Sequence, residues 1–402
     1  MNEQGNMEFT FENMMKCYKK ATEENDVNSQ LKLGNCYYYG RGIEQDYKKA
    51  IEWYEKAAEQ GNAEAQNSLG DCYYDGEGTE QDYSKAVEWY RKSAEQGYDW
   101  GQYNLADCYY DGEGVEQDKE KAVELYKKSA EQGNVEAQYI LANCYYNGEG
   151  VEQDKEEAVA WYKKTAEQGN PEAQNVLANC YYSGEGTQQD YSKAVKWYKR
   201  SAEQGYNWGK YNLANCYYNG EGVEQDKEEA VAWYKKSAEP GNAVAQNRLA
   251  NCYYNGQGTE QDYSKAVEWY KKSAEQGYDW GQYNLANCYY NGNGVEQDYS
   301  KAVEWYKKSA GQGYDWGQYN LASRYYDGNG IEQDYSKAVE WYKKSAEQGN
   351  ADAQNRLAIC YYDGEGTEID YSKAVEWFTG DNTIWQIATM MEMELNKIIQ
   401  RL

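Results

Sequence analysis

The chain has 402 residues, and its 68 aspartates and glutamates against 41 lysines and arginines give a formal charge of −27. Nucleic acids and anionic membrane surfaces need clustered lysine and arginine, so this composition argues against both as partners and leaves basic proteins or peptides. The chain has no histidine and no closely spaced cysteine pair. Neither a metal site nor a cofactor is therefore expected.

The first residues, MNEQGNMEFTFENMM, contain no basic region followed by an apolar run, so no secretory signal is expected. No segment approaches the roughly 18–20 apolar residues of a membrane-spanning helix. We therefore expect a cytoplasmic protein, with specialised secretion still open. Residues 11–24 align with the second half of the repeating unit that follows. This alignment predicts that residues 1–26 form a degenerate half-repeat with an N-terminal capping helix.

From residue 27 onward the chain repeats every 36 residues without an insertion or deletion. A fixed period of this size indicates a solenoid, in which each unit packs on its neighbours. The ten units begin near residues 27, 63, 99, 135, 171, 207, 243, 279, 315 and 351. They predict one all-α solenoid domain over residues 27–378, built from helix pairs.

The first helix of a unit, helix A, is expected in the second unit from about Ala63 to Tyr74. Asn62 is its predicted N-cap, and Gly76 ends it in a left-handed conformation. Its apolar residues recur at the spacing of one helical face, namely Ala65, Leu69 and Tyr73.

The second helix, helix B, is expected to follow Asp82, which caps it, and to run to about Gln96. Its inner face is formed by residues at helical spacing, namely Ala86, Trp89, Tyr90 and Ser93. Gly97 then closes the unit.

One cysteine marks each unit, and only Arg324 interrupts the column of Cys36, Cys72, Cys108, Cys144, Cys180, Cys216, Cys252, Cys288 and Cys360. Equivalent positions on stacked helices lie about 8–10 Å apart, whereas a disulfide needs Cα atoms within about 7 Å. We therefore expect reduced thiols in a reducing compartment, each acting as a small buried hydrophobic residue.

The end of the chain departs from the repeat, because a different helix is predicted over residues 383–402. Its apolar residues form a stripe, and the favoured interpretation is a C-terminal cap over residues 379–402 that covers the last core face. Dimerisation or partner binding through the same stripe is the alternative.

The repeated residues resemble the pattern of the Sel-one-like repeat (SLR) family, a relative of the tetratricopeptide repeats. The fourth unit carries this pattern as Ala137, Leu141, Ala142, Tyr145, Gly148, Gly150, Val151, Asp154, Ala158, Trp161, Ala166, Gln168 and Gly169. The resemblance covers residues 27–377, with departures such as Leu125 in place of a tryptophan. It implies a right-handed superhelix of helix pairs that acts as an adaptor or scaffold without catalysis.

No motif of the chain predicts chemistry. The GEG loops lack the third glycine of a phosphate-binding loop, and the acidic run from Asp75 to Asp82 does not have the ligand spacing of an EF-hand. No nucleophile has a histidine to activate it, so we expect no enzymatic activity, no catalytic residue and no metal ligand.

The variable columns of helix A are the better functional candidates. In tetratricopeptide relatives these positions, here 64, 67, 71, 74 and 75 and their equivalents, line a concave surface. They carry Trp–Tyr pairs and two columns of equivalent residues. One column is Asp or Asn, such as Asp107 and Asn143, and is called the Asp or Asn ladder. The other is Tyr, such as Tyr110 and Tyr146, and is called the Tyr ladder. The candidate binding residues are Trp100, Tyr103, Asp107, Tyr110, Asp111, Asn143, Tyr146, Asn179, Tyr182, Trp208, Tyr211, Asn215, Tyr218, Asn251, Tyr254, Trp280, Tyr283, Asn287, Tyr290, Trp316 and Tyr319.

Asparagine can donate to and accept from a peptide backbone, and Trp and Tyr offer large contact areas. The hypothesis is therefore a non-catalytic adaptor whose concave face binds a protein or an extended peptide. The alternative is that the aromatic residues pack internally, because each Trp unit follows a helix B that begins with Tyr-Ser-Lys, as at Tyr83. The alternative functions are an architectural protein that self-assembles and a host-interacting bacterial effector.

Overall fold

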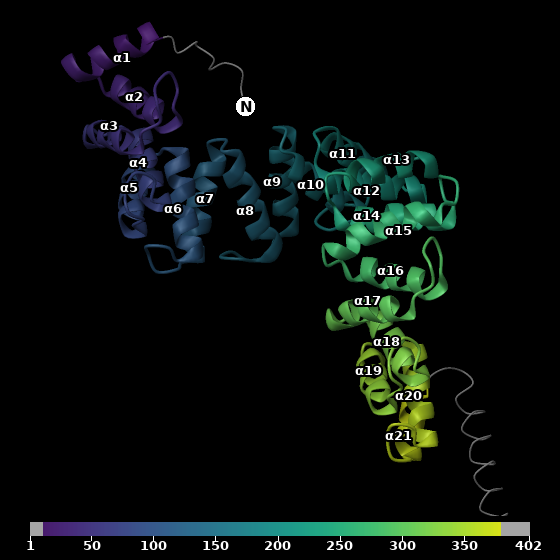
Figure 1. The fold of residues 1–402 in the computed structure, drawn as a ribbon. Coiled ribbons are helices and arrows are strands. Elements are labelled where there is room, and N and C mark those ends of the chain that lie inside the picture. The colour runs from purple at the N-terminus through teal and green to yellow at the C-terminus, as the bar shows by residue number, and fades with distance from the viewer. Residues whose placement is uncertain (1–10, 379–402) are drawn as a thin grey trace, which may run out of the picture. The chain divides into compact units, whose positions relative to one another are not determined.

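The computed structural model describes residues 11–378 (Figure 1). This part of the chain contains α-helices and no strand. The helix α1 spans Phe11–Glu23. The A helices of the ten repeats are α2 (Val27–Tyr39), α4 (Ala63–Asp75), α6 (Asp99–Asp111), α8 (Val135–Asn147), α10 (Pro171–Ser183), α12 (Asn207–Asn219), α14 (Ala243–Asn255), α16 (Asp279–Asn291), α18 (Asp315–Asp327) and α20 (Ala351–Asp363). The B helices are α3 (Tyr47–Glu59), α5 (Tyr83–Glu95), α7 (Lys119–Glu131), α9 (Lys155–Glu167), α11 (Tyr191–Glu203), α13 (Lys227–Ala238), α15 (Tyr263–Glu275), α17 (Tyr299–Gly311), α19 (Tyr335–Glu347) and α21 (Tyr371–Trp377).

The chain divides into two compact units, Met1–Gln204 and Gly205–Leu402. Within each unit an A helix packs on the B helix of its own repeat and on the B helix of the repeat before it. This alternation continues along the ribbon of each unit in Figure 1. The predicted all-α solenoid of 36-residue helix pairs is therefore confirmed in both units, while the right-handed twist stays a prediction.

Local capping chemistry sets the helix ends where the sequence places them. The side chain of Asn62 accepts a hydrogen bond of 2.8 Å from the backbone N–H of Ala65, and Gly76 ends α4 at a φ of 74°. Asp82 accepts at 3.0 Å from the N–H of Lys85 and so caps α5. Each cap satisfies a backbone group that the helix end would otherwise leave unpaired.

The second glycine of the turn between helices A and B fixes the contact between repeats. Gly78 has a φ of +80°, and a Cβ atom placed on it would lie 2.7 Å from the carbonyl carbon of Tyr47 in the preceding repeat. Any larger residue would be strained in the left-handed region and would also clash with that backbone. The turn therefore packs directly against the first residue of the B helix in the preceding repeat.

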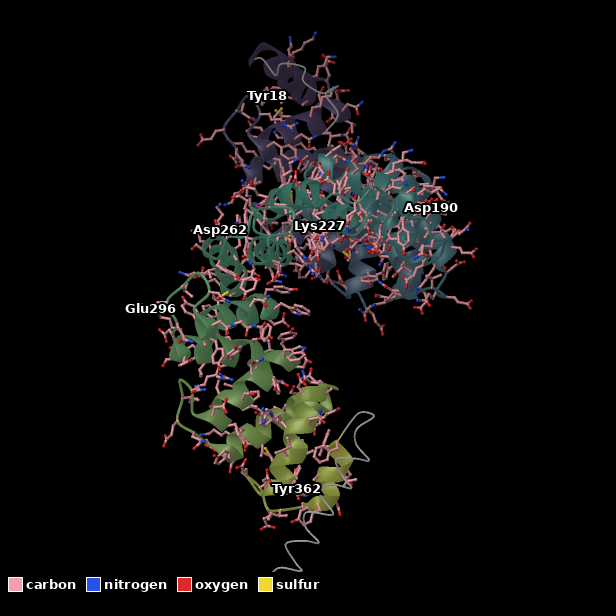
Figure 2. All side chains as sticks on the ribbon, turned by 90° about the vertical axis from the view of Figure 1, so that its right-hand side faces the viewer. Tyr18, Asp190, Lys227, Asp262, Glu296 and Tyr362 are labelled. Carbon is pink, nitrogen blue, oxygen red and sulfur yellow. The ribbon has the colours of Figure 1, made fainter. Side chains whose placement is uncertain are left out.

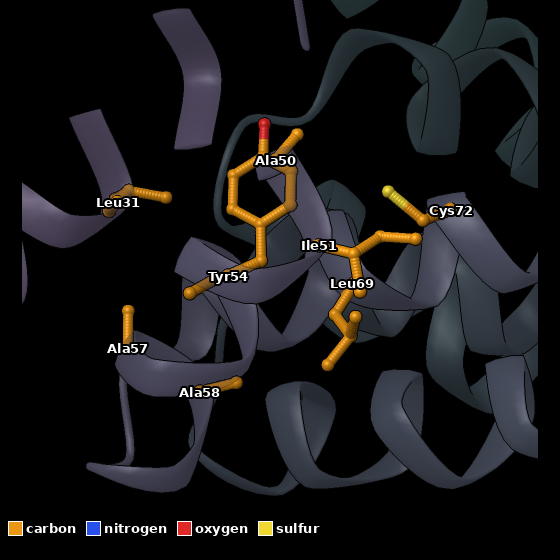
Figure 3. Close-up of a cluster of buried hydrophobic side chains, with 9 residues drawn as sticks. Leu31, Ala50, Ile51, Tyr54, Ala57, Ala58, Leu69 and Cys72 are labelled. Atoms are coloured by element: carbon orange, nitrogen blue, oxygen red, sulfur yellow. The ribbon is translucent and has the colours of Figure 1, made fainter. Parts of the chain in front are cut away.

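The core runs from one repeat into the next. Tyr54 is 1% exposed and lies among residues of its own repeat, such as Leu31 and Ala50. Leu69 and Cys72, which come from the next A helix, complete the same cluster (Figure 3). Because neighbouring repeats share each cluster, a repeat is stable only beside its neighbours.

The cysteine column behaves as the sequence predicts. All nine repeat cysteines are free thiols and buried, and burial raises the pKa of Cys72 to about 12. Such thiols are protonated and serve as small apolar residues.

The two predicted capping regions differ in what the structure describes. Helix α1 packs on α2, and its Ala21 contacts the cluster of Leu33 and Trp53. The predicted C-terminal cap, residues 379–402, lies outside the described residues. Figure 2 draws the side chains on the ribbon and labels Asp190 in the first unit and Glu296 in the second.

Candidate protein-binding face

The predicted binding residues all lie on A helices. Successive A helices contact one another, as α4 does with α6 in the first unit and α14 with α16 in the second. At these places the surfaces of neighbouring A helices therefore adjoin one another. We call their surface the inner face, defined by Glu64, Asn67, Asp71, Tyr74 and Asp75 and the equivalent positions of the other repeats.

Tryptophan is exposed on the inner face. The exposed fractions of Trp100, Trp208, Trp280 and Trp316 are 42%, 44%, 45% and 38%. The ring of Trp100 meets that of Tyr103 edge to face at 5.7 Å, and Tyr103 lies 5.9 Å from the buried ring of Tyr126. Tyr103 is therefore part of the packing, whereas Trp100 leaves much of its ring exposed. Trp280 differs, because its ring lies 5.2 Å from that of Tyr314, the N-cap residue of α18.

The first tyrosine of each B helix that begins with Tyr-Ser-Lys contacts a tyrosine of its own repeat. The sequence suggests a different partner, the tryptophan of the following repeat. The ring of Tyr83 lies 5.0 Å from that of Tyr74 in its own repeat, and Tyr263 lies 4.9 Å from Tyr254. No ring contact joins Tyr83 to Trp100 within the described chain. The co-occurrence of Tyr-Ser-Lys with a following Trp repeat is thus not a direct aromatic contact.

The Asp or Asn ladder is held by tyrosines of the B helices. Tyr126 Oη donates to Asp107 at 2.5 Å, and Tyr270 Oη donates to Asn251 at 2.6 Å. The same bond is made to Asn143, Asn179, Asn215 and Asn287. The bond from Tyr270 fixes the orientation of the Asn251 amide, whose N–H groups can then donate to a ligand.

The Tyr ladder has a structural role that the sequence reasoning missed. Tyr110 donates its hydroxyl hydrogen to Glu149, and Tyr146 donates to Glu185. In the second unit Asn293 Nδ2 donates at 2.6 Å to Tyr254 Oη. In each of these bonds the partner of the tyrosine is the residue between the two glycines of the next repeat, 39 positions on. These tyrosines therefore join consecutive repeats, and only their rings are left for a ligand.

The inner face of the first unit is acidic, and two of its carboxyl groups have a raised pKa. Burial raises the pKa of Asp71 to about 7, against the lowering effect of the hydrogen bond from Tyr90. Burial likewise raises the pKa of Asp107 to about 6, opposed by hydrogen bonds from Tyr126 and Tyr103. Both groups would regain interaction energy beside a cation.

Two hollows lie on the inner face, one in each unit. The hollow in the first unit has a volume of about 400 Å³, and Glu64, Asp71 and Trp100 line it. The hollow in the second unit has a volume of about 370 Å³ and is lined mainly by asparagines, including Asn251 and Asn287. The structure thus brings predicted residues together within each unit, in an acidic group and an amide group.

Both hollows also contain a residue that the sequence reasoning passed over. Asn104 donates to Asn67 at 3.0 Å and to Asp71 at 3.0 Å, and Asn284 donates to Asn247 at 2.9 Å. Each follows the Tyr of a Trp–Tyr pair. That recurring Tyr-Asn dipeptide was the signal that could have identified them.

Arg324 stands where the other repeats have a cysteine, and it places a positive charge among buried residues of the second unit. Arg324 is 7% exposed, and its guanidinium lies 4.0 Å from the ring centre of Tyr290. Its Nη2 is 3.6 Å from Asp327, while Nε and Nη1 have no hydrogen-bond partner in the described chain. The ring of Tyr290, one of the predicted binding residues, is therefore covered on one side.

Within residues 11–378, no group of three His, Cys, Asp or Glu side chains could hold a metal ion. The helices of the same range are all too short or too polar to cross a membrane.

Solved structures give the chain clear relatives. It is similar to c5321, a protective antigen of uropathogenic Escherichia coli strains with an SLR fold, at 35% identity and a TM-score of 0.67, covering 97% of this chain and 91% of that one. It is also similar to a Sel1 repeat protein from Oxalobacter formigenes at 32% identity and a TM-score of 0.57, covering 72% and 84% of the two chains. No curated protein matches the chain.

The Sel1 repeat family model matches ten segments, namely residues 27–62, 63–98, 101–134, 135–170, 171–206, 209–242, 243–278, 281–314, 317–350 and 351–379. In the four repeats that carry tryptophan on helix A, the match begins just after that tryptophan, as at residue 101 after Trp100. Sel1 repeats commonly mediate protein–protein interactions and are generally non-catalytic. Because the matches cover most of its length, the chain belongs to the Sel1 repeat family.

Proposed function

We propose that the protein is a non-catalytic adaptor that binds an extended protein segment on the inner face of its A helices. The observation that carries the proposal is the exposure of Trp100, Trp208, Trp280 and Trp316, between 38% and 45% of each side chain. Tryptophan is enriched among the residues that dominate binding energies, so four tryptophans exposed at the same repeat position are candidates for contact with a partner.

The tryptophans are also variable residues of the repeat rather than constant ones. The family match omits each of them, and repeats such as 243–278 keep the same fold with Val244 in that place. Packing of the solenoid therefore does not require tryptophan there. A ligand that stacks on these rings would explain why four repeats carry one.

The polar groups beside the rings suit a peptide backbone. The tyrosines of the B helices fix Asn251 and Asn287 in one orientation by hydrogen bonds of 2.6 and 2.5 Å. A side chain held in this way loses little conformational entropy when it binds. Its amide N–H groups can donate to backbone carbonyls of an extended segment.

The charge of the first unit favours a basic partner. Asp71 and Asp107 are half-buried carboxyl groups with raised pKa values, beside the exposed Asp111. A lysine or arginine of the partner would lower these pKa values and gain charge-assisted hydrogen bonds. We expect the partner segment to carry basic residues where it meets this unit.

A peptide selection tests the proposal. A random peptide library is selected against the full chain, and the peptides that bind are titrated against the wild type and the double variant Trp208→Ala/Trp280→Ala. We expect at least a tenfold loss of affinity, with a thermal midpoint within about 2 °C of the wild type because both rings are exposed.

The matched control is Trp269→Leu, in the tryptophan column of the B helices, where Leu125 already occurs naturally. This variant should bind the peptides as the wild type does. If the double variant instead unfolds at a much lower temperature yet keeps its affinity, the rings are packing residues and the proposal fails.

The two alternative functions stay predictions. Self-assembly through residues 383–402 would be lost on truncation at residue 379, and light scattering would register the lower mass. The effector alternative has one observation on its side, because the similar protein c5321 is described as a protective antigen of uropathogenic Escherichia coli. Peptides selected from a library of host sequences rather than random ones would favour it.

A further inference from the structure

The B helices carry a tryptophan column that covers the core of the preceding repeat. Trp89 packs against the cluster that contains Leu69 and Cys72, and Lys92 Nζ lies 3.7 Å from the centre of its ring. The same lysine contact is made to Trp161, at 3.7 Å from Lys164. Each indole thus lies between apolar side chains of the core and the ammonium group of a lysine.

Leu125 replaces this tryptophan in the third repeat and leaves a hollow between α5, α6 and α7. Its volume is about 420 Å³, within the range of small-ligand sites. Apolar groups of Ala94, Leu105 and Leu125 line it, together with the ring of Tyr109. We call this site the Leu125 hollow.

Three cations and one carboxylate also line the Leu125 hollow, namely Arg91, Lys121, Lys128 and Glu95. Lys121 Nζ lies 2.7 Å and Arg91 Nη2 lies 3.2 Å from Tyr109 Oη. Burial would raise the pKa of Tyr109, but the hydrogen bonds from these two cations lower it. The hollow is therefore electropositive in a chain whose formal charge is −27.

Lys121 differs from the lysines at its position in other repeats, because no ion pair to a carboxylate is recorded for it in the described chain. Lys85, at the position of Lys121 in the second repeat, lies 3.5 Å from Asp82, and Lys193 lies 3.2 Å from Asp190. The charge of Lys121 is instead directed to Tyr109 at the hollow. An anionic ligand there would not have to displace an existing ion pair.

We propose that the Leu125 hollow binds an aromatic ring that carries a carboxylate. The ring takes the place of the missing indole on Leu105 and Leu125, and Lys128 covers it as Lys92 covers Trp89. The carboxylate lies between Arg91 and Lys121, where charge-assisted hydrogen bonds form. Such a group can be a free aromatic acid or the last residue of a partner chain that ends in an aromatic residue.

Ligand-observed NMR tests the proposal with N-acetyl-tryptophan and its neutral isostere N-acetyl-tryptophanamide as probes. This readout avoids the fluorescence of the 14 tryptophans of the protein. We expect the acid to bind at least ten times more tightly than the amide, because only the acid has a charge for Arg91 and Lys121. Equal affinity for the two probes would mean that the hollow is only an apolar depression, and would overturn the proposal.

Two substitutions test whether the acid binds in the Leu125 hollow. Each introduces a residue that other repeats carry at the same position. Leu125→Trp restores the residue of the other repeats and fills the hollow, and it should abolish binding of the acid. Lys121→Glu places the residue that stands at the equivalent positions Glu157 and Glu229, and it should remove the preference for the acid. Unchanged binding by Leu125→Trp would overturn the proposal.

The matched control opens a hollow without the cation. Trp161→Leu removes the indole in the fourth repeat, where Glu157 stands in place of Lys121 and lies 2.8 Å from Trp161 Nε1. In the Leu125→Trp background this variant should bind the amide at least as well as the acid. A preference for the acid here would show that any hollow in this column selects it, and would contradict the role given to Lys121.

A peptide arm distinguishes the two sources of the ligand. The probe is a flexible hexapeptide that ends in tryptophan with a free carboxylate, compared with the same peptide amidated. Tighter binding of the free peptide than of N-acetyl-tryptophan identifies a partner chain terminus, and equal or weaker binding identifies a free acid. The Leu125 hollow is separate from the inner face, so its test is independent of the proposed adaptor function.

Discussion

Asp71 in the first unit and Asn251 in the second make the same hydrogen bond, but only Asp71 can carry a charge. Tyr90 Oη lies 2.8 Å from Asp71 Oδ1, and Tyr270 Oη lies 2.6 Å from Asn251 Oδ1. Burial raises the pKa of Asp71 to about 7. The fold therefore accepts either side chain, and the carboxylate is the less favourable choice for stability.

An aspartate at this position lowers the stability of the fold, yet it occurs at both Asp71 and Asp107. We infer that it is retained for binding. The acidic and amide parts of the inner face are then suited to different features of a partner. Asp71 and Asp107 suit basic side chains, and the asparagines suit a backbone that has no charge.

The largest expected effect comes from removing the tyrosine hydroxyl that bonds to Asp71 in one unit and to Asn251 in the other. Tyr90→Phe leaves the carboxylate of Asp71 without its nearest donor and should destabilise α4 and α5 by about 2–3 kcal/mol at pH 8, whereas Tyr270→Phe should cost about 1 kcal/mol in α14 and α15. Hydrogen exchange of the amides in these helices measures both. Equal losses would mean that charge does not distinguish the two regions.

The second prediction removes the charge itself. The pKa of Asp71 in the folded protein, about 7, lies above its ordinary value of 3.8, so the stabilisation by the protonated side chain is present below pH 4 and is lost as the pH rises through 7. Asp71→Asn should therefore stabilise the protein by about 2 kcal/mol at pH 8. The gain should vanish near pH 4, and urea unfolding at both pH values measures it. A gain that is the same at both would contradict the raised pKa.

The smallest effect concerns Arg324, a buried charge in the described part of the second unit. Arg324→Cys restores the cysteine column and removes two unpaired donors, Nε and Nη1. It also removes the contact with Tyr290 and the ion pair with Asp327, which offset part of the gain. We expect a net stabilisation of about 1 kcal/mol by thermal unfolding. A loss of stability would show that the contact with Tyr290 outweighs the unpaired donors.

Local chemistry made the helices predictable from the sequence. Asn62, Gly76 and Asp82 act within a few residues of themselves, and the helix ends follow from them. The repeat period then predicts the stack, because each unit can pack only on a copy of itself.

The contacts of the candidate site depend on register between helices, and the sequence does not reveal that. Tyr126 reaches Asp107 across 19 residues, and Tyr110 reaches Glu149 across 39. The replacement of a tryptophan by Leu125 is visible in the sequence. That Arg91 and Lys121 meet at the hydroxyl of Tyr109 depends on how three helices pack.

The tyrosine bonds between consecutive repeats also bear on how the solenoid responds to force. Tyr74, Tyr110 and Tyr146 donate to carboxylates, whereas Tyr218 pairs with Gln257 and Tyr254 with Asn293. Hydrogen bonds to an ionised group are roughly twice as strong as those between neutral groups. Under tension along the chain, the interfaces closed by Gln257 and Asn293 should separate first, so mechanical compliance is graded along the array although the backbone repeats.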